Sequence, residues 1–458
     1  MMAWRRLFLV VPGLALLALV FAGLRLQESD DLTWAIAANF AGLRPQESDD
    51  LTWVIAAVLA QGAVYFVAVF WVVSRRPSPL GLILIFAALL RLPLLFSEPY
   101  LSDDVYRYVW DGRVQAAGIN PYRYVPDAPE LEGLRDEDIY PNINRSDYAV
   151  TIYPPAAQVF FFLTTRVSES VTWMKASLLA WEALAIALLL LLLRRAGQPD
   201  ALVLLYAWHP LPLWEFAGNG HLDAAAIACI LAALLARERG RRALVGVALG
   251  IATLFKIYPL ALLPALWRPG DRRMPAALAA TISIGYLPYL GVGLGVLGFL
   301  PGYVREEGVL GGSRYYLLRV AEKLGAHLGP AVYIVPVGLS LAALSAWICW
   351  RRRPRDDFAG GALLLASAAV VAFSPPHTWY FAWLLPLGAL ATSTPILLLG
   401  VLVFLLYLEG WSRLWMEALI YVPFLLFALS RTRIARPWRL LFRRSREGPD
   451  GERPHPAA

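Results

Sequence analysis

The sequence predicts an all-α protein that crosses a membrane many times. Of its 458 residues, 59% are hydrophobic and only 16% are charged, and the mean hydropathy is +0.55, which is far more apolar than a soluble domain. Apolar runs such as 51–73, 178–193 and 328–350 have about the 17 to 25 residues that cross the hydrocarbon core of a bilayer. Because backbone groups find no water there, each run is expected to be a helix.

Arginines at the ends of the apolar runs account for most of the net charge of +7. The clusters are Arg75-Arg76, Arg194-Arg195, 237–242, Arg272-Arg273, 351–355 and 431–444. Such clusters mark the cytoplasmic ends of membrane helices, so the basic charge does not indicate a nucleic-acid partner. The two cysteines, Cys229 and Cys349, lie in apolar runs, which argues against a disulfide framework or a thiolate metal site.

Residues 1–96 are expected to form amino-terminal membrane helices at about 7–24, 51–73 and 79–96. They include a local tandem duplication, because 21–38 and 40–57 are near copies of each other. A single duplicated unit does not predict a stacked repeat fold. Each copy carries a pair of acids ahead of an apolar run, and we interpret the four aspartates as helix caps and first-turn acids: Asp30, Asp31, Asp49 and Asp50.

The segment 97–153 is the long polar stretch of the chain and is predicted to be a first outer, catalytic loop. If its beginning is helical, Asp103, Arg107 and Asp111 share one face, with Asp104 close to Arg107. The alternative is a surface helix stabilised by ion pairs. Prolines at 121, 126, 129 and 141 exclude one long helix, so short interfacial helices joined by turns are expected.

The rest of the chain, 154–430, is predicted to be a transmembrane bundle that brings the total to roughly 13 to 15 membrane segments. We expect 154–165 to be re-entrant or a short tilted helix, because a full span would place the later arginine clusters outside. The run around Lys256 is too short to cross twice, which predicts two half-helices meeting at a break. A second outer loop is expected at 301–327, and a basic cytoplasmic tail at 431–458.

The candidate chemistry is displacement of a phosphate from a sugar. This reaction needs a base near the attacking hydroxyl and cations near the leaving phosphate. Asp103 is our first candidate for the base, with Asp104 as helper or alternative, and a single working carboxylate predicts inversion at the anomeric carbon. The candidate phosphate ligands are Arg107, Arg145, Lys256 and Arg314. Alternatively, these residues form ion pairs with nearby acids or are loop residues whose charge faces solvent.

Other polar and aromatic residues are candidates for substrate binding. His221 and Asp223 precede an apolar helix, where they bind substrate or cap the helix. With an outer-loop carboxylate they could also hold a divalent metal, but the spacing does not favour it and no cofactor is predicted. The remaining candidates are Trp110, Asp111, Tyr153, His377 and Tyr380, with Glu215 as a secondary one. The aromatic ones could instead serve only as interfacial anchors.

Several motifs resemble bacterial GT-C glycosyltransferases, in particular the polyprenol-phosphomannose-dependent alpha-mannosyltransferases. The resemblance covers roughly 80–430 and is carried by 102–113, 118–122, Asn142 to Arg145, 151–155, Asn219 to Asp223 and His377 to Tyr380. It implies a GT-C-like bundle in a bacterial cytoplasmic membrane with its active site on the extracytoplasmic side. It also implies a polyprenyl-phosphate sugar donor, a glycolipid or glycan acceptor, and an acid of the first outer loop as the base. In this sequence that acid is Asp103 or Asp104.

Two other classes of protein compete with the enzyme. A transporter or lipid-linked-sugar flippase commonly shows matched halves with ionisable residues at mid-membrane, whereas here the acids concentrate in an outer loop. A non-catalytic envelope subunit would tolerate neutral replacement of Asp103 and Asp104. No cytoplasmic segment is long enough for a nucleotide-binding domain of roughly 100 residues, so an activated sugar is expected to arrive from the membrane.

Overall fold

The computed structural model describes residues 2–28, 49–75, 79–350, 358–408 and 412–431. Within these ranges the chain is helical and contains no strand. The prediction of an all-α polytopic membrane protein is therefore confirmed. The predicted caps Asp30 and Asp31, the side chains of Asp49 and Asp50, the central part of the duplication and the tail from 432 onward lie outside the described residues.

Five helices in the described part of the chain are long and apolar enough to cross a bilayer, at 9–27, 51–74, 171–195, 273–306 and 330–350. Six shorter apolar helices accompany them, at 80–96, 155–165, 242–255, 358–373, 378–391 and 394–407. At about 1.5 Å of rise per residue, the short ones cannot each cross a core of about 30 Å as straight helices. They must stop within the bundle or continue into a neighbouring helix.

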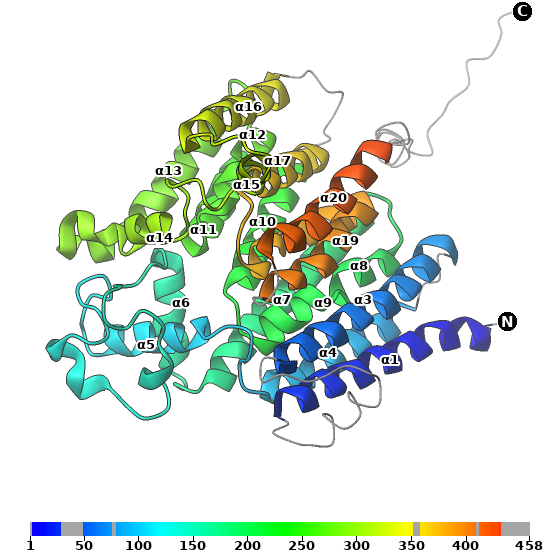
Figure 1. Cartoon of the computed structure of the whole chain (residues 1–458), viewed down its shortest axis with the longest axis horizontal. Coiled ribbons are helices and arrows are strands. Elements are labelled where there is room, and N and C mark those ends of the chain that lie inside the picture. The colour runs from blue at the N-terminus through cyan, green and yellow to red at the C-terminus, as the bar shows by residue number, and fades with distance from the viewer. Residues whose placement is uncertain (1, 29–48, 76–78, 351–357, 409–411, 432–458) are drawn as a thin grey trace, which may run out of the picture.

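The amino-terminal helices pack together at one side of the molecule. They are α1 (Met2–Glu28), α3 (Asp49–Arg75) and α4 (Leu80–Phe96), and α1 contacts both of the others. Their bounds agree with the runs expected from the sequence. In Figure 1 they lie across the molecule from the polar segment that follows α4.

That polar segment consists of short helices and turns, as its prolines predict. It contains α5 (Asp104–Ala116) and two 3-10 turns, η1 (Pro129–Leu134) and η2 (Tyr140–Asn142). The next helix, α6 (Pro155–Thr165), has 11 residues, which span only about 16 Å. The expectation of a short helix at 154–165 therefore agrees with the structure, and α6 packs against α5 (Figure 1).

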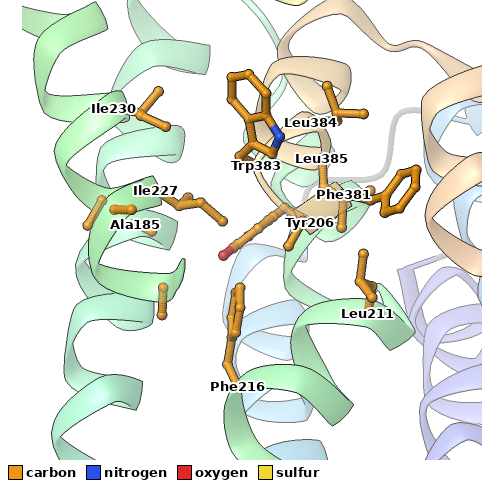
Figure 2. Packing of buried hydrophobic residues seen from close by; sticks show 14 of the residues in the cluster. Ala185, Tyr206, Leu211, Phe216, Ile227, Ile230, Phe381, Trp383, Leu384 and Leu385 are labelled. Atoms are coloured by element: carbon orange, nitrogen blue, oxygen red, sulfur yellow. The ribbon is translucent and has the colours of Figure 1, made fainter. Parts of the chain in front are cut away.

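The centre of the bundle is formed by a long helix and a series of short turns. The elements are α7 (Val171–Arg195), η3 (Asp200–Val203), α8 (Leu204–Ala207), α9 (Pro210–Pro212), the π-helical turn η4 (Leu213–Gly218) and α10 (Asp223–Glu238). Figure 2 shows Tyr206 of α8 among Phe216 of η4, Ile227 of α10 and Trp383. All four side chains are buried, so this apolar centre holds η4 and α10 in place.

The helix break predicted at Lys256 is present. α11 (Arg242–Phe255) ends there, and Lys256 itself is extended, with φ −145° and ψ 145°. The chain continues through η5 (Tyr258–Leu262), α12 (Leu263–Leu266), α13 (Arg273–Tyr286), η6 (Leu287–Leu297) and α14 (Leu300–Glu306). The predicted second outer loop thus contains most of α14, and also α15 (Tyr316–Lys323) before α16 (Pro330–Trp350).

The last described helices return to the centre of the bundle. They are α17 (Phe358–Phe373), η7 (Thr378–Phe381), α18 (Leu384–Ala391), α19 (Thr394–Leu402), η8 (Val403–Tyr407) and α20 (Arg413–Arg431). η7 and η8 contact each other. Together with α5, the Lys256 break and α14, they surround the cavity described next.

Candidate active site

A cavity of about 950 Å³ lies where the polar segment meets the bundle. This volume is at the upper end of the range for small-molecule sites. Eight of the predicted site residues line it: Asp103, Asp104, Arg107, Arg145, Tyr153, Lys256, His377 and Tyr380. They come from segments far apart in the sequence, so the fold gathers most of the candidates into one place.

Five predicted site residues do not line the cavity. Trp110 is buried, and its ring lies 5.7 Å from that of Tyr140. Asp111 is buried in a hydrogen-bond network within the polar segment. His221 and Asp223 lie directly behind cavity-lining residues, and Arg314 lies beyond Glu307.

The amino-terminal end of α5 presents two carboxylates to the cavity. The Ser102 hydroxyl accepts a hydrogen bond from the Asp104 amide at 3.3 Å, and the helix dipole favours negative charge here. Asp103 precedes the helix, and its carboxylate accepts a hydrogen bond of 2.6 Å from the Asn144 side chain. Asp103 is more exposed than Asp104, whose side chain is only 18% exposed. Asp104 is therefore the deeper of the two.

The helical spacing that predicted a shared face on α5 produces an ion pair between Arg107 and Asp111, with an N–O distance of 2.9 Å. Arg107 also donates to the carbonyl of Ala149. Asp111 accepts from Thr151 at 2.5 Å and from Gln158 at 2.8 Å. These bonds attach α5 to α6 and to the chain before it. They support the alternative role of Arg107, since its donors already have acceptors within the protein.

Lys256 is one of the cations that line the cavity. Its Nζ lies 3.4 Å from the buried carboxylate of Asp223, which also accepts a hydrogen bond of 3.0 Å from the Tyr258 hydroxyl. The same Nζ lies 5.4 Å from the centre of the Tyr153 ring and 5.7 Å from that of Tyr380. An extended residue at a helix break can place its ammonium group in this way, while Asp223 offsets the cost of burying it.

His221 lies between two acids. Gly220 has a φ of +72°, a left-handed conformation suited to glycine, and the turn lets the His221 amide donate to the Glu215 carbonyl at 2.9 Å. His221 Nε2 lies 3.3 Å from Glu215 Oε2, and Nδ1 lies 3.8 Å from Asp104 Oδ2. The imidazole stacks on the Trp379 ring at 4.0 Å between centres.

Glu306, the last residue of α14, and Glu307, which follows it, connect the second outer loop to the cavity. Arg145 has a φ of 55°, a strained conformation for a residue with a side chain, and forms a 2.9 Å ion pair with Glu306. Glu307 lies 3.2 Å from His377 Nε2 and 3.8 Å from Arg314. Arg314 therefore pairs with Glu307 and does not itself line the cavity.

The two cavity carboxylates differ in acidity. Burial acts to raise the pKa of Asp104, but the charges of His221, Lys256 and His377 outweigh it and the pKa falls below its ordinary value. Partial burial raises the pKa of Asp103, although the hydrogen bond from Asn144 opposes this. Asp104 therefore stays ionised to a lower pH than Asp103.

Several residues of the site were missed or given little weight in the sequence. Asn144, Tyr258, Tyr303 and Trp379 line the cavity, and Glu307 lies behind it. Asn144 and Trp379 belong to motifs noted above, and Tyr258 follows Lys256 by two positions, so their neighbours were the available signal. Within the described ranges no group of three or more His, Cys, Asp or Glu side chains has the arrangement of a metal site.

The arrangement combines acids, a cation and aromatic rings around one space. Asp104 can accept a proton, Lys256 can face an anion, and Tyr153 and Tyr380 offer ring faces to a sugar. The lining also includes the apolar side chains of Leu405, Leu406, Leu408 and Met416, together with the cation Arg413. A molecule that combines a sugar phosphate with a hydrocarbon chain fits this mixed lining.

Comparison with known proteins identifies the family. Residues 10–268 match the model of the MptA_B family, described as "Alpha-(1->6)-mannopyranosyltransferase, N-terminal domain". This match covers more than half of the 458 residues and includes α5, the π-turn η4 and Lys256. No curated protein and no solved structure matches the chain. The chain therefore belongs to the MptA_B family of alpha-mannosyltransferases and is a membrane mannosyltransferase, which uses a sugar donor and an acceptor.

Proposed function

We propose that this protein is a GT-C-type enzyme that transfers mannose from a polyprenyl-phosphate donor to a hydroxyl group of a glycolipid or glycan. The observation that carries the proposal is one cavity whose lining includes both the charged residues Asp104 and Lys256 and the leucines of η8. The acids and cation suit a phosphate-activated sugar, and the leucines suit an isoprenoid chain. A water-soluble nucleotide sugar would gain nothing from these leucines.

Asp104 is the better placed of the two carboxylates to act as base. It is deeper in the cavity than Asp103, remains ionised and has Lys256 and His221 as neighbours. During transfer, the acceptor oxygen forms a bond to the anomeric carbon while the bond to the phosphate oxygen breaks and its electron pair leaves with the phosphate. Asp104 takes the hydroxyl proton, and Lys256 and Arg145 face the developing negative charge.

One displacement at the anomeric carbon inverts its configuration. The family description specifies an alpha-(1->6) product. An inverting enzyme that forms an alpha linkage requires a donor whose mannose is beta-linked to the phosphate. The stereochemistry of the donor therefore follows from the proposed mechanism.

The arginine clusters indicate the side of the membrane. α7 has 25 residues and is about 38 Å long. Its beginning lies next to Glu169, which pairs with Arg113 of α5 at 2.7 Å, and its end carries Arg194 and Arg195. Since basic residues stay in the cytoplasm, we place α5 and the cavity at the extracytoplasmic face of a bacterial cytoplasmic membrane.

The proposal is tested with membranes that contain the full-length protein. Radiolabelled mannose is supplied on a polyprenyl phosphate, in the alpha or the beta configuration, or on a nucleotide sugar, and an alpha-1,6-linked mannooligosaccharide serves as the acceptor probe. We expect transfer only from the beta-linked lipid donor. Transfer from the nucleotide sugar in the absence of lipid donor would overturn the proposal, and movement of the lipid donor across the membrane without transfer would identify a flippase.

A further inference from the structure

The buried imidazole of His221 lies between Asp104, which lines the cavity, and Glu215, which is inside the bundle. The His221 and Glu215 side chains are fully buried, with 0% exposure. Neither ring nitrogen makes a hydrogen bond of good geometry, although Nε2 is 3.3 Å from Glu215 and Nδ1 is 3.8 Å from Asp104. Buried polar atoms normally have partners, so an imidazole held this way between two acids requires an explanation.

Glu215 is more firmly held than His221. Its Oε1 accepts hydrogen bonds from the hydroxyls of Thr378 and Tyr407, and its Oε2 accepts one of 3.1 Å from Asn219. It lies on the π-helical turn η4, a type of irregularity frequent at functional sites. Glu215 thus has a fixed position from which it can stabilise a positive charge on His221.

The other charged and titratable groups near this chain come from every element around it. They are Lys256 after α11, Asp223 on α10, Tyr153 before α6, His377 before η7 and Tyr407 on η8. Lys256 is paired with Asp223, and His377 with Glu307. Glu215 and Asp104 are therefore the acids that His221 faces directly.

We propose that His221 and Glu215 are positioning residues that carry the acceptor's proton away from Asp104, a role that rests on the function proposed above. Asp104 takes the hydroxyl proton as the new glycosidic bond forms. It then passes the proton to His221 Nδ1, while the Nε2 hydrogen points to Glu215, whose negative charge stabilises the imidazolium. The proton leaves to water through the cavity when the products depart. A carboxylate with a lowered pKa is a weak base, and this relay compensates for that weakness.

The relay requires one protonation state of His221 before transfer. Nδ1 can accept the proton from Asp104 only while it has a free lone pair, so the ring starts neutral, with its hydrogen on Nε2 facing Glu215. After the transfer both nitrogens carry a hydrogen, and the carboxylate of Glu215 stabilises the imidazolium. Loss of the relay should therefore lower kcat and leave donor binding unchanged, because neither residue lines the cavity.

The test measures kcat and the donor KM for beta-mannosyl polyprenyl phosphate with the alpha-1,6-mannooligosaccharide probe, using the full-length protein. We expect His221→Gln to lower kcat roughly 10- to 100-fold and to leave the donor KM within about twofold. Glu215→Gln keeps an oxygen acceptor for Thr378 and Tyr407 and is expected to lower kcat by a smaller factor, again with an unchanged donor KM. If His221→Gln does not reach the membrane, Glu215→Gln decides the outcome.

His209→Gln is the matched control. His209 is also fully buried, and its ring contacts the Leu397 carbonyl at 3.0 Å and the Leu211 amide at 3.1 Å, with no acid as a partner. Its replacement is expected to change the amount of folded protein without lowering kcat per folded molecule. An unchanged kcat per folded molecule in both His221→Gln and Glu215→Gln would overturn the relay. If Asp104→Asn still abolishes transfer in that case, the proposed function survives while the relay does not.

Discussion

Two buried charge clusters in this protein are built differently. In the interior of the bundle, Arg91 binds Glu182 through two hydrogen bonds of 2.7 and 2.5 Å, and its remaining donor reaches the carbonyls of Ala87 and Ala207. Beside the cavity, Lys256 Nζ lies 3.4 Å from Asp223 Oδ2, and this oxygen makes no hydrogen bond of good geometry. The charged groups of the first cluster are held by short hydrogen bonds, whereas the second cluster leaves an acceptor without one.

The difference shows how structural and functional charges can be told apart. A buried ion pair that stabilises a fold needs all of its hydrogen bonds, because each missing one costs free energy. A site that must bind a charged substrate keeps some bonding capacity unused until the substrate arrives. The cluster around Lys256, Asp223 and His221 has this property, and the Arg91 cluster does not.

The largest expected effect is on stability, in Arg91→Met. The substitution leaves Glu182 buried without a partner, and the free energy of unfolding should fall by about 3–5 kcal/mol. Adding Glu182→Leu should recover most of the loss. Thermal unfolding of the purified protein in detergent measures both changes. Mannose transfer per folded molecule should be unchanged in either variant. A large drop in that rate would contradict the structural role of the Arg91 cluster.

In contrast to Arg91→Met, Lys256→Met should reduce mannose transfer even after folding is restored. Adding Asp223→Asn relieves the unpaired acid and should restore folding, but transfer should stay roughly 100-fold below wild type, equivalent to about 2.7 kcal/mol, because the cation facing the phosphate is absent. The rate per folded molecule and the donor KM are measured in membranes. Recovery of transfer in the double variant would mean that Lys256 serves only to pair Asp223.

A third effect concerns pH. The pKa of Asp104 lies below its ordinary value, so its carboxylate form persists at higher pH and is lost as the pH falls through the lowered value. His377 contributes to the lowering, and His377→Gln should therefore move the acidic limb of the transfer rate upward with only a modest change near neutral pH. A downward shift would contradict the assigned electrostatics.

The smallest effect is expected at the rim of the cavity. Asn144 donates a 2.6 Å hydrogen bond to Asp103, and its loss in Asn144→Ala should cost about 1 kcal/mol, or roughly fivefold in transfer rate. The bond opposes the raised pKa of Asp103, so that pKa should rise further. An effect as large as that of Lys256→Met would mean that Asp103 is more important for transfer than this account predicts.

The local sequence pattern predicted the helices and the positions of many candidate site residues. It could not predict which contacts these residues make. The spacing of Arg107 and Asp111 indicated their ion pair, because helical neighbours are fixed by the chain. The pairing of Lys256 with Asp223 and the position of His221 beside Asp104 depend on how η4, α10 and α11 pack. Trp110 was a candidate for substrate binding in the sequence, and only the packing of α5 shows that it is buried beside Tyr140 and does not line the cavity.

The most direct test of the account compares Asp104→Asn with Asp103→Asn in the transfer of labelled mannose from beta-mannosyl polyprenyl phosphate. General-base catalysis contributes roughly 10²- to 10⁴-fold, so we predict a loss of that size in Asp104→Asn and a smaller loss in Asp103→Asn, with wild-type amounts of folded protein in both. Wild-type transfer by the two single variants and by the double variant would contradict the account.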